Sequence, residues 1–252
     1  MYPILFKIGP VAIYTYGVMV ALGIMAGLYF ALKQTKKEVI GSSVIVDIIF
    51  WIILSGFIGA RITYIFVEWK YFTEYPLKAL FAREGFVFYG GFIFSFLAAF
   101  LYVKIKKLNA WKLADILAPS TALGYAIGRL GCFFYGCCYG KPTNSFLGIL
   151  FPPGSPAGSL GVKVIPTQLI SSLILFVIFI ILVMLRKHKK FDGQIFWIFV
   201  LLEAVTRFGI EFLRGDERGS IGAFSVSQVI AIVMAVIAAA ILARLSARNA
   251  AF

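Results

Sequence analysis

Long apolar segments alternate with short polar or basic connections along almost the whole chain. Each segment runs for about 20 residues, the length an α-helix needs to cross the hydrocarbon core of a bilayer. The predicted spans are 11–32, 44–67, 87–103, 113–139, 166–185, 193–213 and 221–243. The pattern predicts an all-α polytopic integral membrane protein with about seven transmembrane helices, forming a single membrane domain over residues 1–252.

Composition supports this interpretation and excludes another. The chain is 61% hydrophobic and 14% charged, whereas soluble domains average about 45–50% and about 25%. The net charge of +13 could suit a nucleic-acid partner. However, the basic residues stand at the ends of apolar segments, where membrane topology and anionic lipid account for them. We therefore expect a membrane partner and no nucleic acid. The first segment is too long for the apolar part of a cleavable signal peptide, so none is expected.

The basic connections also predict an orientation. More than half of the lysines and arginines fall in four connections that share one side of the membrane: 33–37, 104–112, 186–190 and 244–248. The positive-inside rule places this side in the cytoplasm, so the N-terminus should lie outside and the C-terminus inside. Residues 68–86 and 140–165 then form outer-face loops. The first should include a short helix at the membrane surface, and the second, rich in proline and glycine, should be a lid or substrate-facing loop.

Three arginines lie inside predicted spans: Arg61, Arg129 and Arg207. An arginine at the centre of a membrane helix costs about 2.5–3.5 kcal/mol on insertion scales. Each could simply pair with an acid or extend to the interface. Together they favour an anion site, because guanidinium groups bind phosphate in a bidentate fork and the abundant anion of a membrane is a phospholipid head group.

The sixth span places further charges beside one of these arginines. Glu203, Arg207 and Glu211 follow one another at four-residue spacing and Arg214 comes three residues later, so all four share one helix face. The ladder could only neutralise itself for insertion. Alternatively, the face borders a polar cavity in which Glu203 and Glu211 orient Arg207 toward a ligand.

Three tyrosines occupy the outward halves of other spans: Tyr16, Tyr64 and Tyr89. Tyrosine at this depth is often an interfacial belt residue. Tyr89 precedes Gly90 and Gly91, which allow another helix or a ligand to approach the backbone and would place its hydroxyl beside that contact.

All three cysteines of the chain fall close together, at Cys132, Cys137 and Cys138. They could be packing residues, reactive thiols activated by Arg129, or a soft-metal or disulfide site. On an ideal helix the first two lie about 140° apart, so they share a site only if Gly131 and Gly136 break the helix. Because no histidine or carboxylate is nearby, metal is the weakest option, and we expect neither a metal nor a cofactor.

The order of several motifs resembles the prolipoprotein diacylglyceryl transferases of bacterial inner membranes. The matching stretches are YTYG (14–17), GARITY (59–64), YGGFI (89–93), ADILAP (114–119), GRLG (128–131), PTQL (166–169), TRFGIEFLRGD (206–216) and SVSQ (225–228). The resemblance implies a multi-pass inner-membrane enzyme that moves the diacylglyceryl group of phosphatidylglycerol to the cysteine thiol of a lipoprotein precursor. It further implies that Arg129 and Arg207 hold the phosphate, Glu211 orients Arg207, Tyr16 contacts substrate and Gly140 keeps the outer loop close.

The chain departs from the family pattern at several of these places. Tyr89 replaces the usual histidine, and the sole histidine is His188, in a basic connection. Cys132, Tyr135 and Cys137 replace Asn, Asn and Glu. The hypothesis is therefore a related transferase acting on a thiol or similar acceptor. The alternative is a non-catalytic or thiol-redox membrane protein that keeps the phospholipid cavity.

The predicted site residues fall into three groups. The catalytic candidates are Cys137, Cys138, Tyr89 and Arg207. The lipid- and phosphate-binding candidates are Arg129, Arg207, Tyr16, Arg61 and Tyr64. The orienting candidates are Glu211, Glu203 and Gly140.

Overall fold

The computed structural model describes residues 3–9, 11–35, 40–81, 87–216 and 219–250. The chain divides into two compact units, one made of residues 1–31 and 114–252 and the other of residues 32–113. The basic positions at 36 and 37 and the end of the 68–86 connection lie outside the described residues. Each unit is described by itself below.

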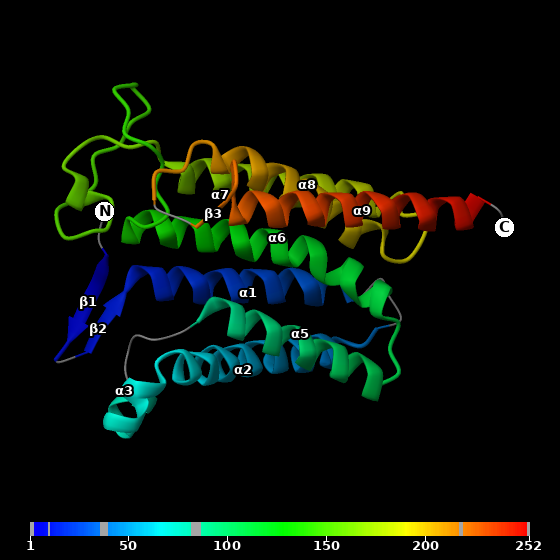
Figure 1. Ribbon diagram of the computed structural model, residues 1–252. Helices are drawn as coiled ribbons and strands as arrows, with labels where there is room; N and C mark the ends of the chain where they lie inside the picture. Colours follow the sequence, from blue (N-terminus) through cyan, green and yellow to red (C-terminus); the bar gives the residue numbers. More distant parts are fainter. Residues whose placement is uncertain (1–2, 10, 36–39, 82–86, 217–218, 251–252) are drawn as a thin grey trace. The chain divides into compact units, whose positions relative to one another are not determined.

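The larger unit begins with a hairpin and is built mainly of long helices (Figure 1). Strands β1 (Ile4–Ile8) and β2 (Val11–Tyr14) pair antiparallel and lead into α1 (Thr15–Thr35). The other long helices are α6 (Ala110–Tyr135), α7 (Thr167–Arg186), α8 (Gln194–Glu211) and α9 (Val226–Ala250). Shorter elements are the 3₁₀ turn η1 (Gly158–Leu160) and the hairpin of β3 (Ser220–Ile221) and β4 (Phe224–Ser225).

The smaller unit is a pair of long helices joined by a connection that contains two short helices. Its helices are α2 (Ser42–Val67), α3 (Trp69–Glu74), α4 (Pro76–Phe81) and α5 (Phe88–Ile105). Glycines let α2 and α5 approach closely, since a Cβ added at Gly91 would lie 3.0 Å from the carbonyl oxygen of Gly56. The Ser95 hydroxyl also donates across this contact to the carbonyl oxygen of Ile52, at 2.8 Å. Gly90 and Gly91 therefore serve a helix contact, as expected.

Each predicted span contains a helix, but three boundaries were wrong. The seventh span begins at Val226 and not at residue 221, because residues 220–225 form the β3–β4 hairpin. Residues 11–14 form β2 instead of starting the first span, because they pair with β1 across a turn at Gly9, whose φ is +56°. The fourth span ends at Tyr135, four residues early, because Gly136 takes a left-handed φ of +80°. The two small hairpins also make the fold mostly helical instead of all-α.

Four of the described helices are long and apolar enough to cross a membrane: α1, α2, α7 and α9 over Val226–Ala247. The apolar helix Tyr89–Ile105 is shorter. Large apolar side chains point outward along it, and Phe92, Phe96 and Phe100 are each more than half exposed at four-residue spacing. Such a face suits contact with lipid, in keeping with the predicted polytopic arrangement. Helices α6 and α8, which carry the ionisable residues, remain predicted spans.

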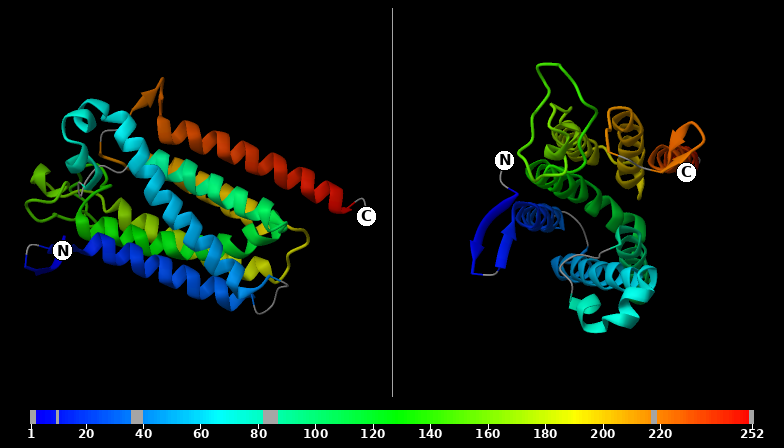
Figure 2. Two further views of the ribbon diagram at one scale, coloured as in Figure 1. Left: turned by 90° about the horizontal axis from the view of Figure 1, so that it is seen from below. Right: turned by 60° about the vertical axis from the view of Figure 1, so that its left-hand side comes forward.

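The long helices of the larger unit run side by side (Figure 1 and Figure 2). Alanines of α6 pack with Ile178 and Leu182 of α7 and Ile195 of α8 in a buried cluster. Phe30 of α1 meets Phe179 of α7 edge to face, with ring centroids 4.8 Å apart. The β1–β2 hairpin and the loop after α6 lie at one end of this unit, and the α7–α8 connection lies at the other (Figure 2).

Candidate functional site

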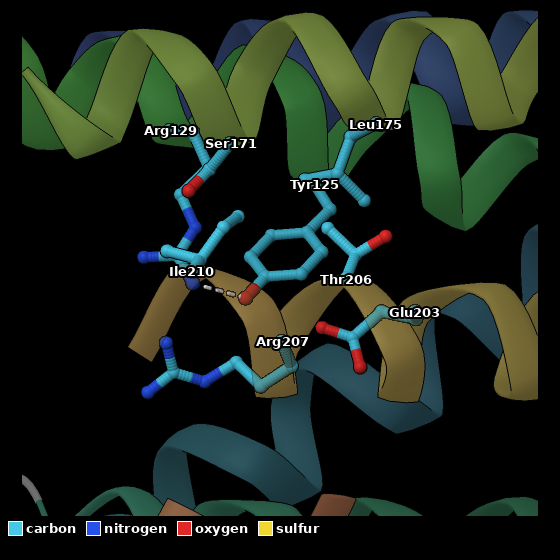
Figure 3. A pocket seen from close by; sticks show the side chains of 8 residues that line it. All are labelled: Tyr125, Arg129, Ser171, Leu175, Glu203, Thr206, Arg207 and Ile210. Atoms are coloured by element: carbon cyan, nitrogen blue, oxygen red, sulfur yellow. Dashed lines mark hydrogen bonds between the residues drawn. The ribbon is translucent and has the colours of Figure 1, made fainter. Parts of the chain in front are cut away.

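A polar pocket opens among α6, α7 and α8 of the larger unit. It has an empty volume of about 260 Å³. Its lining residues are Tyr125, Arg129, Ser171, Leu175, Glu203, Thr206, Arg207 and Ile210. Figure 3 shows the guanidinium groups of Arg129 and Arg207 reaching the same side of the pocket from different helices. Two of the three predicted intramembrane arginines are therefore brought together.

Arg129 has a nitrogen available for a ligand. Its Nη2 donates to the Tyr125 hydroxyl one helical turn earlier, and its guanidinium carbon lies 4.7 Å from the centroid of that ring. Its Nε is buried and has no hydrogen-bond partner in the part of the chain that the structure describes. Leaving a buried donor unpaired costs about 1–3 kcal/mol, so an acceptor that fills this position gains binding energy.

Arg207 is held from two sides. Its Nη2 lies 2.8 Å from Oε2 of Glu211, one turn later on α8, and donates to the Ser227 hydroxyl of α9 at 3.0 Å. The Glu211 side chain is only 5% exposed, so this ion pair is shielded from water. The predicted pairing of Glu211 with Arg207 is thus present, and its effect is to fix where the guanidinium points.

Glu203 lines the same pocket, where both Arg207 and Arg129 act on it electrostatically. Its expected role in orienting Arg207 stays a prediction. Figure 3 shows its carboxylate on the Tyr125 side of the pocket. The face that the sequence predicted therefore borders a polar cavity, with Glu211 as the group bonded to Arg207.

The three cysteines gather just past the end of α6. Their Sγ atoms all lie within 4.8 Å of one another, although Cys132 is helical and the other two follow the helix. The turn at Gly136 makes this possible, and Cys138 itself has a positive φ of +61°. The helix continues through Gly131, so only one of the two predicted breaks occurs, and it is sufficient.

Side chains from the start of α7 hold the cysteine turn in place. The Thr167 hydroxyl donates to the carbonyl oxygen of Cys138 at 2.7 Å, and Nε2 of Gln168 donates to that of Cys137 at 2.6 Å. Both side chains are almost completely buried. Buried hydrogen bonds from α7 therefore stabilise the conformation of this turn.

Gly140 sits where three segments meet. Its amide donates to the carbonyl oxygen of Ile165 at 2.9 Å, and it forms an isolated bridge with Arg214. A Cβ added here would lie 2.7 Å from the carbonyl oxygens of both Ile165 and Leu213. Only glycine fits this crossing, which joins the loop after α6 to the segment after α8.

Arg214 anchors the same crossing. It is 6% exposed and forms a two-pronged contact with Asp216, at 2.7 Å from Nε and 2.5 Å from Nη2. Burial opposes its charge, but hydrogen bonds to the Asp216 carboxylate and the Cys138 sulfur raise the pKa of the guanidinium above its ordinary value. Arg214 thus stays cationic beside the cysteines.

The 140–165 loop is folded around a small core of its own. Phe151, Ala157 and Val164 are buried there and pack against Phe133 and Tyr139. The tip is exposed at Phe146. The loop therefore has a fixed packed base, whereas its expected role as a lid stays a prediction.

The remaining site candidates divide between the two units. Tyr16, at the start of α1 in the larger unit, packs its ring 6.4 Å from that of Tyr135. In the smaller unit, Arg61 donates to the carbonyl oxygen of Leu80 at 3.1 Å and stacks over Tyr64 at 5.5 Å. Tyr89 of that unit is 61% exposed. The pocket is thus lined by residues of the larger unit alone.

Sequence reasoning missed two features of this region. Tyr125 precedes Arg129 by four residues, a spacing that puts both on one helix face and could have revealed the pair. Ser227 lies in the SVSQ stretch, but its bond to Arg207 depends on how α9 packs on α8 and has no local signal.

The chain is similar to known proteins over nearly its whole length. The prolipoprotein diacylglyceryl transferase family profile matches residues 3–244. A phosphatidylglycerol–prolipoprotein diacylglyceryl transferase of Clostridium tetani is 37% identical over 234 residues, covering 92% of this chain and 93% of the relative. Enzymes of the same name from Finegoldia magna and Bacillus licheniformis are 38% and 34% identical, covering 92% and 96% of this chain and 90% and 91% of the relatives. The chain therefore belongs to the prolipoprotein diacylglyceryl transferase family.

Proposed function

We propose that this protein transfers the diacylglyceryl group of phosphatidylglycerol to the cysteine thiol of a prolipoprotein. The observation that carries the proposal is the pocket in which Arg129 and Arg207 converge, with the Nε of Arg129 buried and unpaired among the described residues. A phosphodiester is the membrane anion that matches two guanidinium groups. The names of the relatives supply the donor and the acceptor.

The reaction needs charge stabilisation at the phosphate. The acceptor sulfur forms a bond to the terminal glyceryl carbon of the diacylglyceryl group, and the bond from that carbon to the phosphate oxygen breaks. The oxygen leaves with the electron pair as glycerol phosphate, and the thiol proton is released. Fixed guanidinium groups in the pocket stabilise the negative charge that grows on this leaving group.

The remaining pocket residues have supporting roles in this proposal. Glu211 is a positioning residue, because it holds Arg207 without lining the pocket itself. Glu203 lines the pocket, and its carboxylate is the acidic group there that can accept the thiol proton. This role matters because the chain's sole histidine, His188, lies past the far end of α7.

The fold also supports a membrane orientation. We infer a multi-pass protein of the bacterial inner membrane, with the β1–β2 hairpin and the 140–165 loop on the outer face. These two elements share one end of the larger unit, and the basic α7–α8 connection lies at the other end (Figure 2). The distribution of positive charge assigns that second end to the cytoplasm.

A direct assay tests the proposed function. The purified protein is incubated in lipid nanodiscs with phosphatidylglycerol and a synthetic peptide that carries a lipoprotein-type cysteine. Mass spectrometry of peptide and protein should show the diacylglyceryl group on the peptide cysteine alone. An unmodified peptide with intact phosphatidylglycerol, in protein that remains folded, would refute the proposal. Lipid on Cys137 or Cys138 of the protein would instead identify these thiols as acceptors of the diacylglyceryl group.

A further inference from the structure

The cysteine turn is a cluster that the proposed transfer reaction does not use. Cys132, Cys137 and Cys138 are half-buried, carry no disulfide and place three sulfur atoms within 4.8 Å of one another. Zinc–sulfur bonds of about 2.3 Å set the sulfurs of a three-thiolate site about 4 Å apart. A small closing movement would therefore bring the three sulfurs to coordination distance of one ion.

The backbone of this turn adopts an energetically unfavourable conformation that packing alone does not require. Cys138 adopts a left-handed conformation, which costs a non-glycine residue about 1–2 kcal/mol. Three half-buried cysteines could pack without this conformation, because packing requires only size and apolarity. Strained backbone held by surrounding bonds is typical of functional sites. The conformation turns Cys138 back toward Cys132 and Cys137.

The surroundings supply the further bonds that metal sites need. Thr167 and Gln168 fix the backbone of the two loop cysteines, as second-sphere residues do around metal ligands. The Oε1 atom of Gln168 is buried without a hydrogen-bond partner among the described residues. An acceptor at this place could bond a water that completes the coordination of an ion.

Two cations lie near the cysteine turn. The guanidinium of Arg214 is buried and acts electrostatically on Cys138, and Arg129 acts electrostatically on Cys132 and Cys138. Cationic neighbours favour the thiolate form, which is the form that binds metal. They also offset the net negative charge that three thiolates leave on a monovalent or divalent ion.

We propose that Cys132, Cys137 and Cys138 form a three-thiolate site for one thiophilic d¹⁰ metal ion, Zn²⁺ or Cu⁺, at the junction of α6, α7 and the 140–165 loop. Thiolate ligands select such soft ions over Mg²⁺ or Ca²⁺. The ion would tie the end of α6 to the loop that carries Gly140. The proposal replaces the expectation of no metal, which rested on the lack of a nearby histidine or carboxylate, because the turn at Gly136 gathers three sulfur ligands without them.

The test measures bound metal in the full-length protein and does not depend on transfer activity. Protein is produced with added zinc or added copper, washed with a chelator under reducing conditions, and its metal content is measured by mass spectrometry. We expect about one ion per chain, and the two growth conditions identify which metal is held. Each of Cys132→Ser, Cys137→Ser and Cys138→Ser should weaken metal binding at least about 10-fold.

Alkylation of the thiols provides a second measurement on the unmutated chain. Iodoacetamide should react slowly with the three cysteines in metal-loaded protein and faster after the metal is removed by a strong chelator. Ser159→Cys offers a matched control, because Ser159 is exposed in the nearby loop and its new thiol should react equally fast in both states. Ser159→Ala should keep the full metal content.

Two outcomes would overturn the proposal. One is protein that holds no zinc or copper under either growth condition and whose three thiols react at the same rate with and without added metal. The other is a disulfide among the three cysteines that forms even under the reducing conditions of the test. Mass spectrometry would detect it as a chain two hydrogens lighter. Because both are measured on the unmutated chain, they remain decisive even if a cysteine variant fails to fold.

Discussion

Two arginines from different helices define the pocket, and each is held by a different local device. Arg129 is placed by Tyr125 on its own helix, through a hydrogen bond and ring contact. Arg207 is placed by Glu211 and by Ser227 of α9. Because each guanidinium is fixed before a ligand arrives, little conformational freedom is lost on binding a phosphate.

This arrangement predicts that both arginines are required for lipid binding. Arg129→Ala and Arg207→Ala should each weaken the binding of phosphatidylglycerol by about 1.5–3 kcal/mol, the range for a lost hydrogen bond to a charged group. Lysine should substitute poorly, because its ammonium lacks the planar fork. Native mass spectrometry or lipid titration in nanodiscs would measure this loss.

The control is Lys163→Ala, which removes a positive charge from an exposed position in the outer loop. It should leave lipid binding nearly unchanged. Equal weakening by all three alanine substitutions would mean that overall charge, not the pocket, attracts the lipid.

The sequence could reveal the arginines but not their geometry. Arg129 and Arg207 stand out because charge is costly in apolar segments, and the four-residue spacing to Glu211 predicts its ion pair. The spacing does not distinguish Glu203 from Glu211, since both lie one turn from Arg207. The cysteine cluster could not be predicted, because it depends on the positive φ values of Gly136 and Cys138.

At the scale of elements, a buried carboxylate of α6 fixes the start of α8. Asp115 accepts hydrogen bonds from the backbone amides of Gly193 at 2.8 Å and Phe196 at 2.9 Å. Its side chain is 2% exposed and also lies 3.2 Å from the Nζ atom of Lys189. It therefore satisfies amides at the N-terminus of α8, the helix that carries Arg207.

Asp115→Ala should consequently destabilise the protein by about 1–3 kcal/mol, because it leaves buried amides without an acceptor. Thermal unfolding in detergent or lipid would show the loss. Asp192→Ala is the matched control, since Asp192 also bonds Lys189 but is more exposed, and an exposed ion pair contributes about 0–1 kcal/mol. Equal stability of the two variants would mean that Asp115 does not stabilise the start of α8.

Helices α1 and α6 approach each other through their backbones. A Cβ added at Gly23 would lie 2.6 Å from the carbonyl oxygen of Gly124, and one added at Gly27 would lie 2.9 Å from that of Ser120. Small residues at four-residue spacing permit such close packing in membrane helices. The contact sets the position of α6, which carries Arg129.

A pair of glycine substitutions tests this contact. Gly23→Ala should destabilise the protein by about 1–3 kcal/mol through overpacking against backbone. Gly17→Ala, on the same helix, meets nothing within 4 Å and should be neutral or stabilising by up to about 1 kcal/mol, the gain in helix propensity. The reverse order of melting temperatures in these two variants would contradict the described crossing of α1 and α6.

Hydropathy located every long helix but not where each begins or ends. The first span was placed too early because Val11–Tyr14 is as apolar as the helix that follows, and only its pairing with β1 makes it a strand. Such pairing is tertiary information. A glycine often follows the end of a helix, so Gly136 could have indicated where α6 ends. Gly131 is an equally good candidate by sequence alone, yet the helix continues through it.

For the whole molecule, the orientation in the membrane determines which compartment the pocket and the 140–165 loop face. A single-cysteine scan on a background without native cysteines would test the predicted topology. Thiols introduced by Ser159→Cys should react with a membrane-impermeant reagent from outside, and those introduced by His188→Cys only from the cytoplasm. The opposite labelling pattern would invert the orientation, and labelling of both from one side would change the number of spans between them.

Family membership confirms that the chain is a transferase of this kind. In the proposed reaction, Arg129 and Arg207 bind the donor in the pocket and stabilise the phosphate as the acceptor thiol replaces it. Donor cleavage should then be coupled to acceptor modification, because the departing phosphate and the new carbon–sulfur bond belong to one step. Hydrolysis of the lipid by water would break this coupling.

The most direct test therefore measures the ratio of glycerol phosphate released to thioether formed. Glycerol phosphate released from phosphatidylglycerol and thioether formed on a cysteine peptide are measured together, for the unmutated protein and for Arg129→Lys and Arg207→Lys. This mechanism predicts one glycerol phosphate for each thioether, no release without peptide, and a rate at least about 10-fold lower in both lysine variants. Release of glycerol phosphate without peptide, or full coupled rates in both lysine variants, would contradict it.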